Sequence, residues 1–232
     1  MTVIQTRGLA KTYVGGDGGT IHVLDGIDLD VHRGEMIAVV GASGAGKSTL
    51  LHLLGALDQP SRGEVVLDGV SLGTLTDAAL ARIRNDKVGF VFQFHHLLRE
   101  FSALENVMMP LRIAGWPPAR ARSRAEELLA RLGLGGRMSH RPAALSGGEQ
   151  QRTAVARALA IDPAVVLADE PSGNLDHVNA ELLHDQFAAL VRDLEVAMVV
   201  VTHNRSLAAR ADRALLLEDG KLRSADVREV LT

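Results

Sequence analysis

The chain has 232 residues, of which 47% are hydrophobic and 23% are charged, a balance typical of a folded globular protein rather than a disordered one. Its formal net charge of −3 offers no bulk attraction to nucleic acid or to an anionic membrane. It has no cysteine, which excludes disulfides, thiolate metal sites and cysteine catalysis.

Short strand-like segments near the amino-terminal end predict an antiparallel β layer. Val3–Thr6 and Ile27–Val31 are the first two of these segments. Val65–Leu67 and Val70–Leu72 then flank Asp68-Gly69, a dipeptide that strongly indicates a tight hairpin turn. We expect these segments to pair as antiparallel strands.

A phosphate-binding loop is the clearest motif of the first half. It follows Met36–Val40, a continuous apolar run typical of a strand buried on both faces, and it precedes a helical run at Leu50–Leu57. The pattern G-x-x-x-x-G-K-[ST] is matched by Gly41, Ala42, Ser43, Gly44, Ala45, Gly46, Lys47, Ser48 and Thr49. The glycines would let backbone N–H groups wrap a β-phosphate, while Lys47 would contact the β- and γ-phosphates and the Ser48 hydroxyl would coordinate Mg²⁺.

The middle of the chain changes character and predicts a mostly helical insertion over residues 95–160. An alternating strand, Val88–Gln93, precedes it. Pro110 and two later prolines break the segment, and Ala119–Leu132 predicts a helix with Gly133 as its carboxyl-terminal cap. The arginines of this region alternate with glutamates, which favours a solvated helix face over nucleic-acid binding.

The octapeptide Leu145-Ser146-Gly147-Gly148-Glu149-Gln150-Gln151-Arg152 predicts a second phosphate grip. It opens a helix that continues to Ala160 with good helix formers and an apolar stripe. The start of such a helix presents unpaired backbone N–H groups and about half a positive charge, which suits a phosphate. Because the chain already has one phosphate loop, this second grip makes sense if it holds a nucleotide that is bound to a different subunit.

Two later apolar runs end in residues suited to phosphate chemistry. Ala164–Ala168 is followed by Asp169 and Glu170. Asp169 would reach the Mg²⁺ shell through water, and Glu170, which faces the other way, could orient and polarise an attacking water. Ala197–Thr202 is followed by His203, which the residues alone allow to be an ordinary histidine at the edge of the core.

No apolar run approaches the roughly 20 residues needed to cross a bilayer, since even Ala197–Val201 is only a short run. The first residues, Met-Thr-Val-Ile-Gln-Thr-Arg, lack the basic-then-apolar pattern of a signal peptide. We therefore expect a cytoplasmic protein without direct membrane insertion, whose link to a membrane runs through a partner.

In their order and spacing these motifs resemble those of ATP-binding cassette (ABC) ATPases over essentially the whole chain. The resemblance implies an α/β fold: a P-loop NTPase (RecA-like) core with an antiparallel β layer and an inserted helical subdomain. It implies one domain over 1–232, in which 1–93 and 161–232 form the catalytic core and 94–160 the helical subdomain with the signature motif.

The resemblance also implies roles for single residues. Gln93 would touch Mg²⁺ and the attacking water, and His203 would hydrogen-bond the γ-phosphate. Tyr13 would stack on adenine, a contact worth about 1–3 kcal/mol. Asp176 ends the segment Ser172-Gly173-Asn174-Leu175-Asp176, which stands at the position of the family's D-loop and would cross a dimer interface.

Partners follow from the same resemblance. It implies a homodimer in which each of two ATP molecules lies between the 41–49 loop of one subunit and Ser146, Gly147 and Gly148 of the other. It further implies membrane permease subunits, and the apolar residues of the 93–116 region favour that region as their contact.

The string from Gln93 to Val107 resembles the ATP-binding subunits of lipoprotein-releasing (Lol) systems, with Arg99 where a proline is expected. That resemblance implies an ATPase on the cytoplasmic face of the bacterial inner membrane that drives lipoprotein release. The alternative is an ATPase of a related macrolide-exporter-type complex, or of a cell-division permease-like complex that acts by mechanical signalling.

Overall fold

The computed structural model describes residues 1–16 and 18–226. The strands are β1 (Thr2–Val14), β2 (Thr20–His32), β3 (Met36–Val40), β4 (Arg62–Leu67), β5 (Val70–Ser71), β6 (Val88–Phe92), β7 (Val165–Asp169), β8 (Ala197–Val201), β9 (Arg213–Glu218) and β10 (Lys221–Ala225). The α-helices are α1 (Lys47–Leu54), α2 (Asp77–Lys87), α3 (Ala103–Ile113), α4 (Pro118–Arg131), α5 (Gly147–Leu159), α6 (His177–Leu194) and α7 (Arg205–Ala208). Short 3₁₀ turns lie at Leu72–Thr74, Gly135–Arg137 and Pro142–Ala144.

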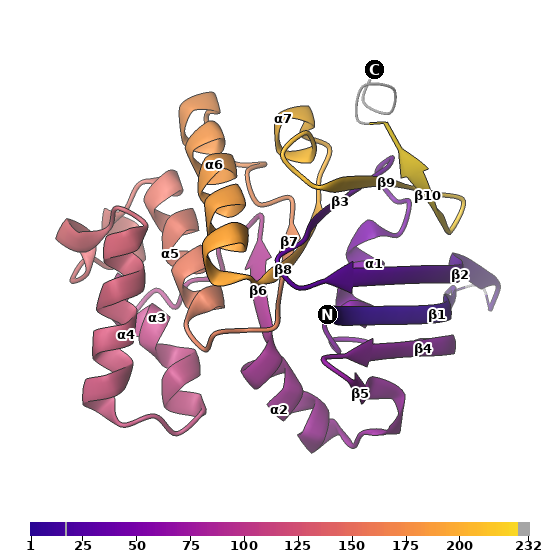
Figure 1. The fold of residues 1–232 in the computed structure, drawn as a ribbon, viewed down its shortest axis with the longest axis horizontal. Helices are drawn as coiled ribbons and strands as arrows, with labels where there is room; N and C mark the ends of the chain where they lie inside the picture. The colour runs from indigo at the N-terminus through magenta and orange to yellow at the C-terminus, as the bar shows by residue number, and fades with distance from the viewer. Residues whose placement is uncertain (17, 227–232) are drawn as a thin grey trace.

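The strands form two sheets, as Figure 1 shows. One has four antiparallel strands in the order β2-β1-β4-β5. The other has six strands in the order β10-β9-β3-β8-β7-β6, in which β9, β3, β8, β7 and β6 are parallel and β10 is antiparallel. The α/β class and the antiparallel layer expected from the sequence are confirmed.

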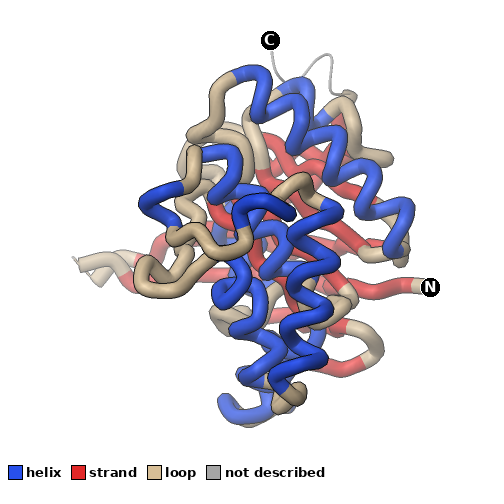
Figure 2. The backbone as a smooth tube through the Cα atoms, turned by 90° about the vertical axis from the view of Figure 1, so that its left-hand side faces the viewer, coloured by secondary structure: helices blue, strands red, loops and turns tan. Residues whose placement is uncertain are grey.

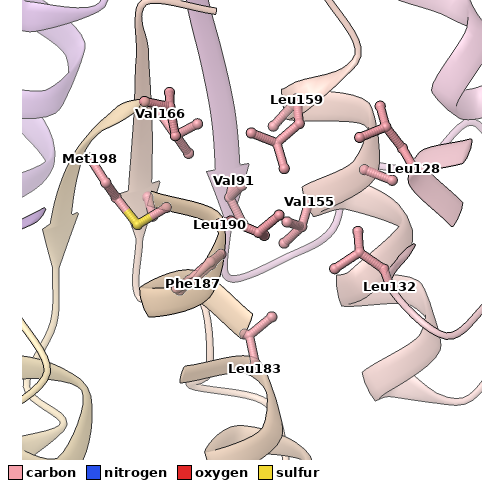
Figure 3. Packing of buried hydrophobic residues seen from close by; sticks show 14 of the residues in the cluster. Val91, Leu128, Leu132, Val155, Leu159, Val166, Leu183, Phe187, Leu190 and Met198 are labelled. Carbon is pink, nitrogen blue, oxygen red and sulfur yellow. The ribbon is translucent and has the colours of Figure 1, made fainter. Parts of the chain in front are cut away.

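The parallel strands separate two hydrophobic cores because successive side chains of a strand point to opposite faces. In β3, Met36, Ala38 and Val40 join the core beneath α3, α4, α5 and α6. Ile37 and Val39 join the other core, beneath α1 and the antiparallel sheet. Figure 3 shows the first core, where side chains from the strands meet those of α4, α5 and α6.

Helices α3, α4 and α5 pack together beside the β6 edge of the parallel sheet, and Figure 2 shows this helical group from its own side. Helix α4 closes with the Gly133 cap that the sequence predicts. Gly133 has φ +74°, its N–H bonds the Ala130 carbonyl at 3.0 Å, and the Leu134 N–H bonds the Leu129 carbonyl at 2.7 Å. This is the bond pattern of a Schellman motif.

The structure corrects the expectation that Pro110 breaks a helix. Pro110 lies inside α3, which begins about two turns earlier with a capping box between Ser102 and Glu105. The cap and the burial of Leu104, Val107 and Leu111 stabilise the helix against the one backbone bond that proline removes. None of the helices that the structure describes has the length and apolar character needed to span a membrane.

Candidate active site

The carboxyl ends of four parallel strands meet along one edge of the sheet and carry most of the predicted site residues. The strands are β3, β8, β7 and β6, which lie side by side in that order. A cavity of about 820 Å³ opens at this edge. It is lined by Val23, Gly41, Ser43, Gly44, Gly46, Lys47, Ser48, Thr49, Phe92, Gln93, Phe94, His96, Asp169, Glu170 and His203.

The loop from Gly41 to Gly46 requires glycine at two positions because neighbouring atoms leave no room for a side chain. A Cβ on Gly41 would lie 2.4 Å from the carbonyl oxygen of Leu217 in β9. A Cβ on Gly46, which has φ +98°, would lie 2.8 Å from Val23 Cγ1. The Lys47 Nζ donates to the carbonyl oxygens of Gly41 and Ala42, each at 2.9 Å, so its cation lies over the loop.

Glu170 is held by three hydrogen bonds from the loop that follows β8. The His203 Nδ1 lies 2.8 Å from Glu170 Oε1, while the Thr202 hydroxyl and the His203 N–H donate to Oε2 at 3.2 and 3.3 Å. The Glu170 side chain is 17% exposed and the His203 side chain 73% exposed. The carboxylate therefore faces the cavity in a fixed orientation beside an accessible imidazole. Asp169, the preceding residue, ends β7 and lines the same cavity.

Gln93 follows β6 and joins the cavity to the segment 172–176. Its Nε2 donates to Asn174 Oδ1 at 3.0 Å, and the Asn174 Nδ2 donates back to the Gln93 carbonyl oxygen at 3.1 Å. This reciprocal amide pair fixes Gln93 against the loop that the sequence predicts to cross a dimer interface. A movement of either segment would therefore also displace the other.

The predicted second phosphate grip lies outside the cavity lining of its own chain. Ser146 caps α5, since its Oγ accepts from the Glu149 N–H at 3.3 Å and Glu149 Oε2 accepts from the Ser146 N–H at 2.8 Å. Arg137 donates to Glu149 Oε1 at 2.8 Å. These contacts lower the pKa of Glu149 to about 2, with the Ser146 N–H as the largest cause and Arg137 next. Gly147 and Gly148 form the first turn of the helix.

Tyr13 and Asp176, two further predicted site residues, are also not among the residues that line the cavity. Tyr13, in β1, donates from its hydroxyl to Asp58 at 2.8 Å, and its ring is 39% exposed. Burial and the Asp58 carboxylate raise the pKa of Tyr13, while a hydrogen bond with Thr49 lowers it and ties the ring to the start of α1. Asp176 caps α6 through the Asn179 N–H at 3.0 Å, and the same contact lowers its pKa.

Sequence reasoning missed Val23, Phe92 and His96 as lining residues. His96 has φ +46° and meets the Phe92 ring edge-on at 5.4 Å between centroids, so it turns toward the cavity while His95 is partly buried. Of the two adjacent histidines only His96 lines this cavity, while both line a neighbouring groove. Val23 comes from β2, which no motif connects with the phosphate loop.

The parallel sheet, the glycine-rich loop between β3 and α1 and the acidic end of β7 together define a P-loop nucleoside triphosphatase. The ABC transporter family profile matches residues 24–173. The chain therefore belongs to the ABC transporter family and is an ABC-type ATPase.

Two relatives match the sequence of this chain over nearly its full length. The chain is 54% identical over 221 residues to the lipoprotein-releasing system ATP-binding protein LolD of Xanthomonas axonopodis pv. citri, covering 95% of this chain and 90% of that one. It is 50% identical over 220 residues to LolD of Syntrophus aciditrophicus, covering 95% and 98%.

Solved structures confirm the fold. The dimeric structure of MJ0796, a bacterial ABC transporter cassette, aligns with a TM-score of 0.88 at 39% identity over 97% of this chain and 99% of that one. A post-hydrolysis dimer of MJ0796 bound to ADP and Pi aligns with a TM-score of 0.87 at 38% identity over the same shares of the two chains.

Proposed function

We propose that this chain is the ATP-hydrolysing subunit of a lipoprotein-releasing transporter at the cytoplasmic face of the bacterial inner membrane. The observation that carries the proposal is the identity of 50–54% with two proteins named as ATP-binding subunits of such systems, over 95% of this chain. The proposal assigns binding and hydrolysis chiefly to residues that line the cavity.

The residues of the cavity fit a magnesium nucleotide. The backbone of Gly41 and Gly46 lies where side chains would collide with neighbours, which leaves the loop N–H groups free to approach phosphate oxygens. The Lys47 ammonium, held over the loop by two carbonyl oxygens, would move to the β- and γ-phosphates. Ser48, Gln93 and Asp169 would hold Mg²⁺, an oxygen-ligand set that this cation prefers. Bound Mg²⁺ would neutralise charge that develops on the phosphoryl oxygens.

Glu170 would act on the attacking water. Because Thr202 and the His203 backbone fix its Oε2, its Oε1 can accept a proton from a water poised for in-line attack on the γ-phosphorus. His203 contacts the same Oε1 and is exposed enough to turn to the γ-phosphate oxygens. Tyr13 would stack on the adenine ring from the carboxyl end of β1.

Two such chains would share each nucleotide. Ser146, Gly147 and Gly148 open a helix outside the lining of their own cavity, and we assign them to the nucleotide of a second subunit. Asp176 and the segment it ends would meet the partner subunit between the two sites. The dimeric structures of the MJ0796 cassette support this arrangement.

The 93–116 region would contact the permease subunits. Phe94, Leu98 and Ile113 are 68%, 42% and 68% exposed, which is unusual for large apolar side chains and typical of a docking surface. Phe94 and Leu97 line a groove of about 620 Å³, and Leu98, Met109 and Ile113 line a second of about 330 Å³. In this proposal, 1–93 and 161–232 bind and hydrolyse ATP and 94–160 transmits the movement.

Copurification from native membranes tests the proposal. A tagged full-length chain, solubilised with native lipid, is expected to bring down two integral-membrane permease subunits, and Phe94→Ser should weaken their recovery at least about tenfold because it removes an exposed apolar anchor. The matched control is Val70→Ser on β5, an apolar residue that is 37% exposed and lies on the edge strand of the antiparallel sheet. Recovery of the chain without any membrane protein would contradict the proposal.

A further inference from the structure

Helix α6 carries a histidine that none of the assigned roles uses. His184 is fully buried, with 0% of its surface exposed, which is rare for a polar residue that binds no metal. Its Nε2 lies 2.9 Å from the Ser172 hydroxyl. Its Nδ1 lies 3.5 Å from Glu181 Oε1 and has no partner at hydrogen-bond geometry among the described residues.

The surroundings of the imidazole favour its neutral form with the proton on Nδ1. Burial lowers the pKa of His184, and the Glu181 carboxylate offsets this only in part. With the proton on Nδ1, on the side of the Glu181 carboxylate, Nε2 is an acceptor and the Ser172 hydroxyl is the donor. The neutral imidazole thus lies between the Ser172 hydroxyl and the Glu181 carboxylate, with its acceptor nitrogen toward Ser172 and its donor nitrogen toward Glu181.

Ser172 lies inside a hydrogen-bonded turn that begins at Glu170. The Gly173 N–H donates to the Glu170 carbonyl at 3.0 Å, and the Leu175 N–H donates to the Ser172 carbonyl at 3.1 Å. Glu170 itself has φ +45°, a left-handed backbone that a non-glycine residue adopts only where its surroundings enforce it. A hydrogen bond that fixes Ser172 therefore also helps to hold the strained Glu170 backbone.

On the other side of His184, Glu181 is hydrogen-bonded to α7, the helix that follows His203. Glu181 accepts from the Ser206 hydroxyl at 2.6 Å and pairs with Arg210 at 2.8 Å, and Ser206 lies in α7, which directly follows that loop. One turn of α6 thus holds both segments that position the catalytic carboxylate: the one that contains Ser172 and the one that contains His203.

We infer that His184 is a positioning residue for ATP hydrolysis, which acts by fixing the Ser172 hydroxyl and so the backbone of Glu170 and the segment 172–176. This inference rests on the proposed role of Glu170. It assigns no contact with ATP to His184, so its loss should lower kcat while it leaves the KM for ATP unchanged.

Steady-state hydrolysis by the purified full-length chain tests the inference with a double-mutant cycle. His184→Phe, which keeps the volume, and Ser172→Ala should each lower kcat about tenfold, with KM within about twofold of the unsubstituted chain. The combined variant should also be about tenfold slower rather than about a hundredfold, because both changes remove the same bond. His184→Gln, whose amide can still accept from Ser172, should keep kcat within about threefold of that of the unsubstituted chain.

A structural control separates positioning from loss of stability. Phe187→Leu changes another fully buried side chain of α6, one turn further on, and should lower the thermal midpoint without changing kcat. The inference is overturned if His184→Phe retains full kcat, if the two losses multiply, or if Phe187→Leu lowers kcat equally. Undiminished hydrolysis by Glu170→Gln would instead overturn the proposed role of Glu170, on which the inference rests.

Discussion

At the scale of single residues, the arrangement around Glu170 shows how an unfavourable backbone conformation serves the site. The backbone N–H of Glu170 still bonds the Val201 carbonyl oxygen at 2.9 Å, so the chain leaves the sheet only after this residue. The left-handed turn then swings the side chain toward Thr202 and His203. Strain at one residue thus aims a carboxylate into the cavity, and the surrounding hydrogen bonds offset its cost of about 1–3 kcal/mol.

Glu170→Gln tests the role of this carboxylate. The amide keeps the shape and can still accept from Thr202, but it is too weak a base to take a proton from water. We expect hydrolysis to fall at least about 100-fold, whereas ATP binding and ATP-driven dimerisation persist. Phosphate release and size-exclusion chromatography with ATP measure the two effects. Glu127→Gln on the exposed face of α4 is the matched control, and equal hydrolysis by the two variants would rule out the assigned role.

At the scale of elements, α5 begins with a cap that is stabilised by charge. Glu149 receives hydrogen bonds from the Ser146 N–H and from Arg137, and its side chain is only 18% exposed. Gly148 packs so closely on α6 that a Cβ there would lie 2.5 Å from Asn179 Oδ1. The first turn of the helix is therefore rigid before any second subunit binds, which suits a preformed phosphate grip.

The depressed pKa of Glu149 makes this cap pH-dependent. The pKa of Glu149 falls from 4.5 to about 2 on folding. The contribution of its carboxylate to the free energy of unfolding is therefore complete above pH 4.5 and is lost as the pH falls toward 2. At neutral pH, Glu149→Gln should lower the free energy of unfolding by about 1 kcal/mol. The difference in thermal midpoint between the two chains should shrink below pH 4.5. Glu100→Gln, at an exposed glutamate, is the control. A difference in thermal midpoint that is independent of pH would contradict the cap's dependence on charge.

Sequence patterns predicted some elements well because local chemistry decides them. Asp68-Gly69 and Asp219-Gly220 both take two consecutive positive φ values, so each forms the tight hairpin turn that its dipeptide indicates. The first strand was predicted as Val3–Thr6, but β1 extends to Val14, since a register shift between Thr6 and Leu9 carries it past Gly8. Periodicity of two fails across such a bulge, so the sequence pattern ended early.

The candidate site likewise has features that the sequence predicts and features that it does not. The phosphate loop and the acid pair were predictable because their spacing along the chain is fixed by strand, turn and helix. The contacts of His184 with Ser172 and of Gln93 with Asn174 were not predictable, because they join residues 12 and 81 positions apart and depend on how α6 packs. The roles assigned to the individual site residues stay predictions until variants test them.

At the scale of the whole molecule, the amino-terminal end of α5 lies outside the cavity lining, and in the proposed dimer each of the two would carry half of a nucleotide site. Arg157 connects the halves: it lies on α5 and donates to the carbonyl oxygens of His95 and His96 at 2.8 and 2.7 Å, in the segment that follows Gln93. Gln151, also on α5, donates to the Phe92 carbonyl oxygen at 3.2 Å. A movement of α5 toward a partner's nucleotide would therefore also displace the region proposed to contact the permease.

The distribution of lipoproteins between the two membranes is the measurement that tests this account most directly. In bacteria whose native chain is replaced by the Glu170→Gln variant, outer-membrane lipoproteins should accumulate in the inner membrane, because the complex assembles but cannot complete hydrolysis. Glu127→Gln should leave the distribution normal. A normal distribution with Glu170→Gln, or division filaments without any lipoprotein defect, would contradict the assignment to lipoprotein release.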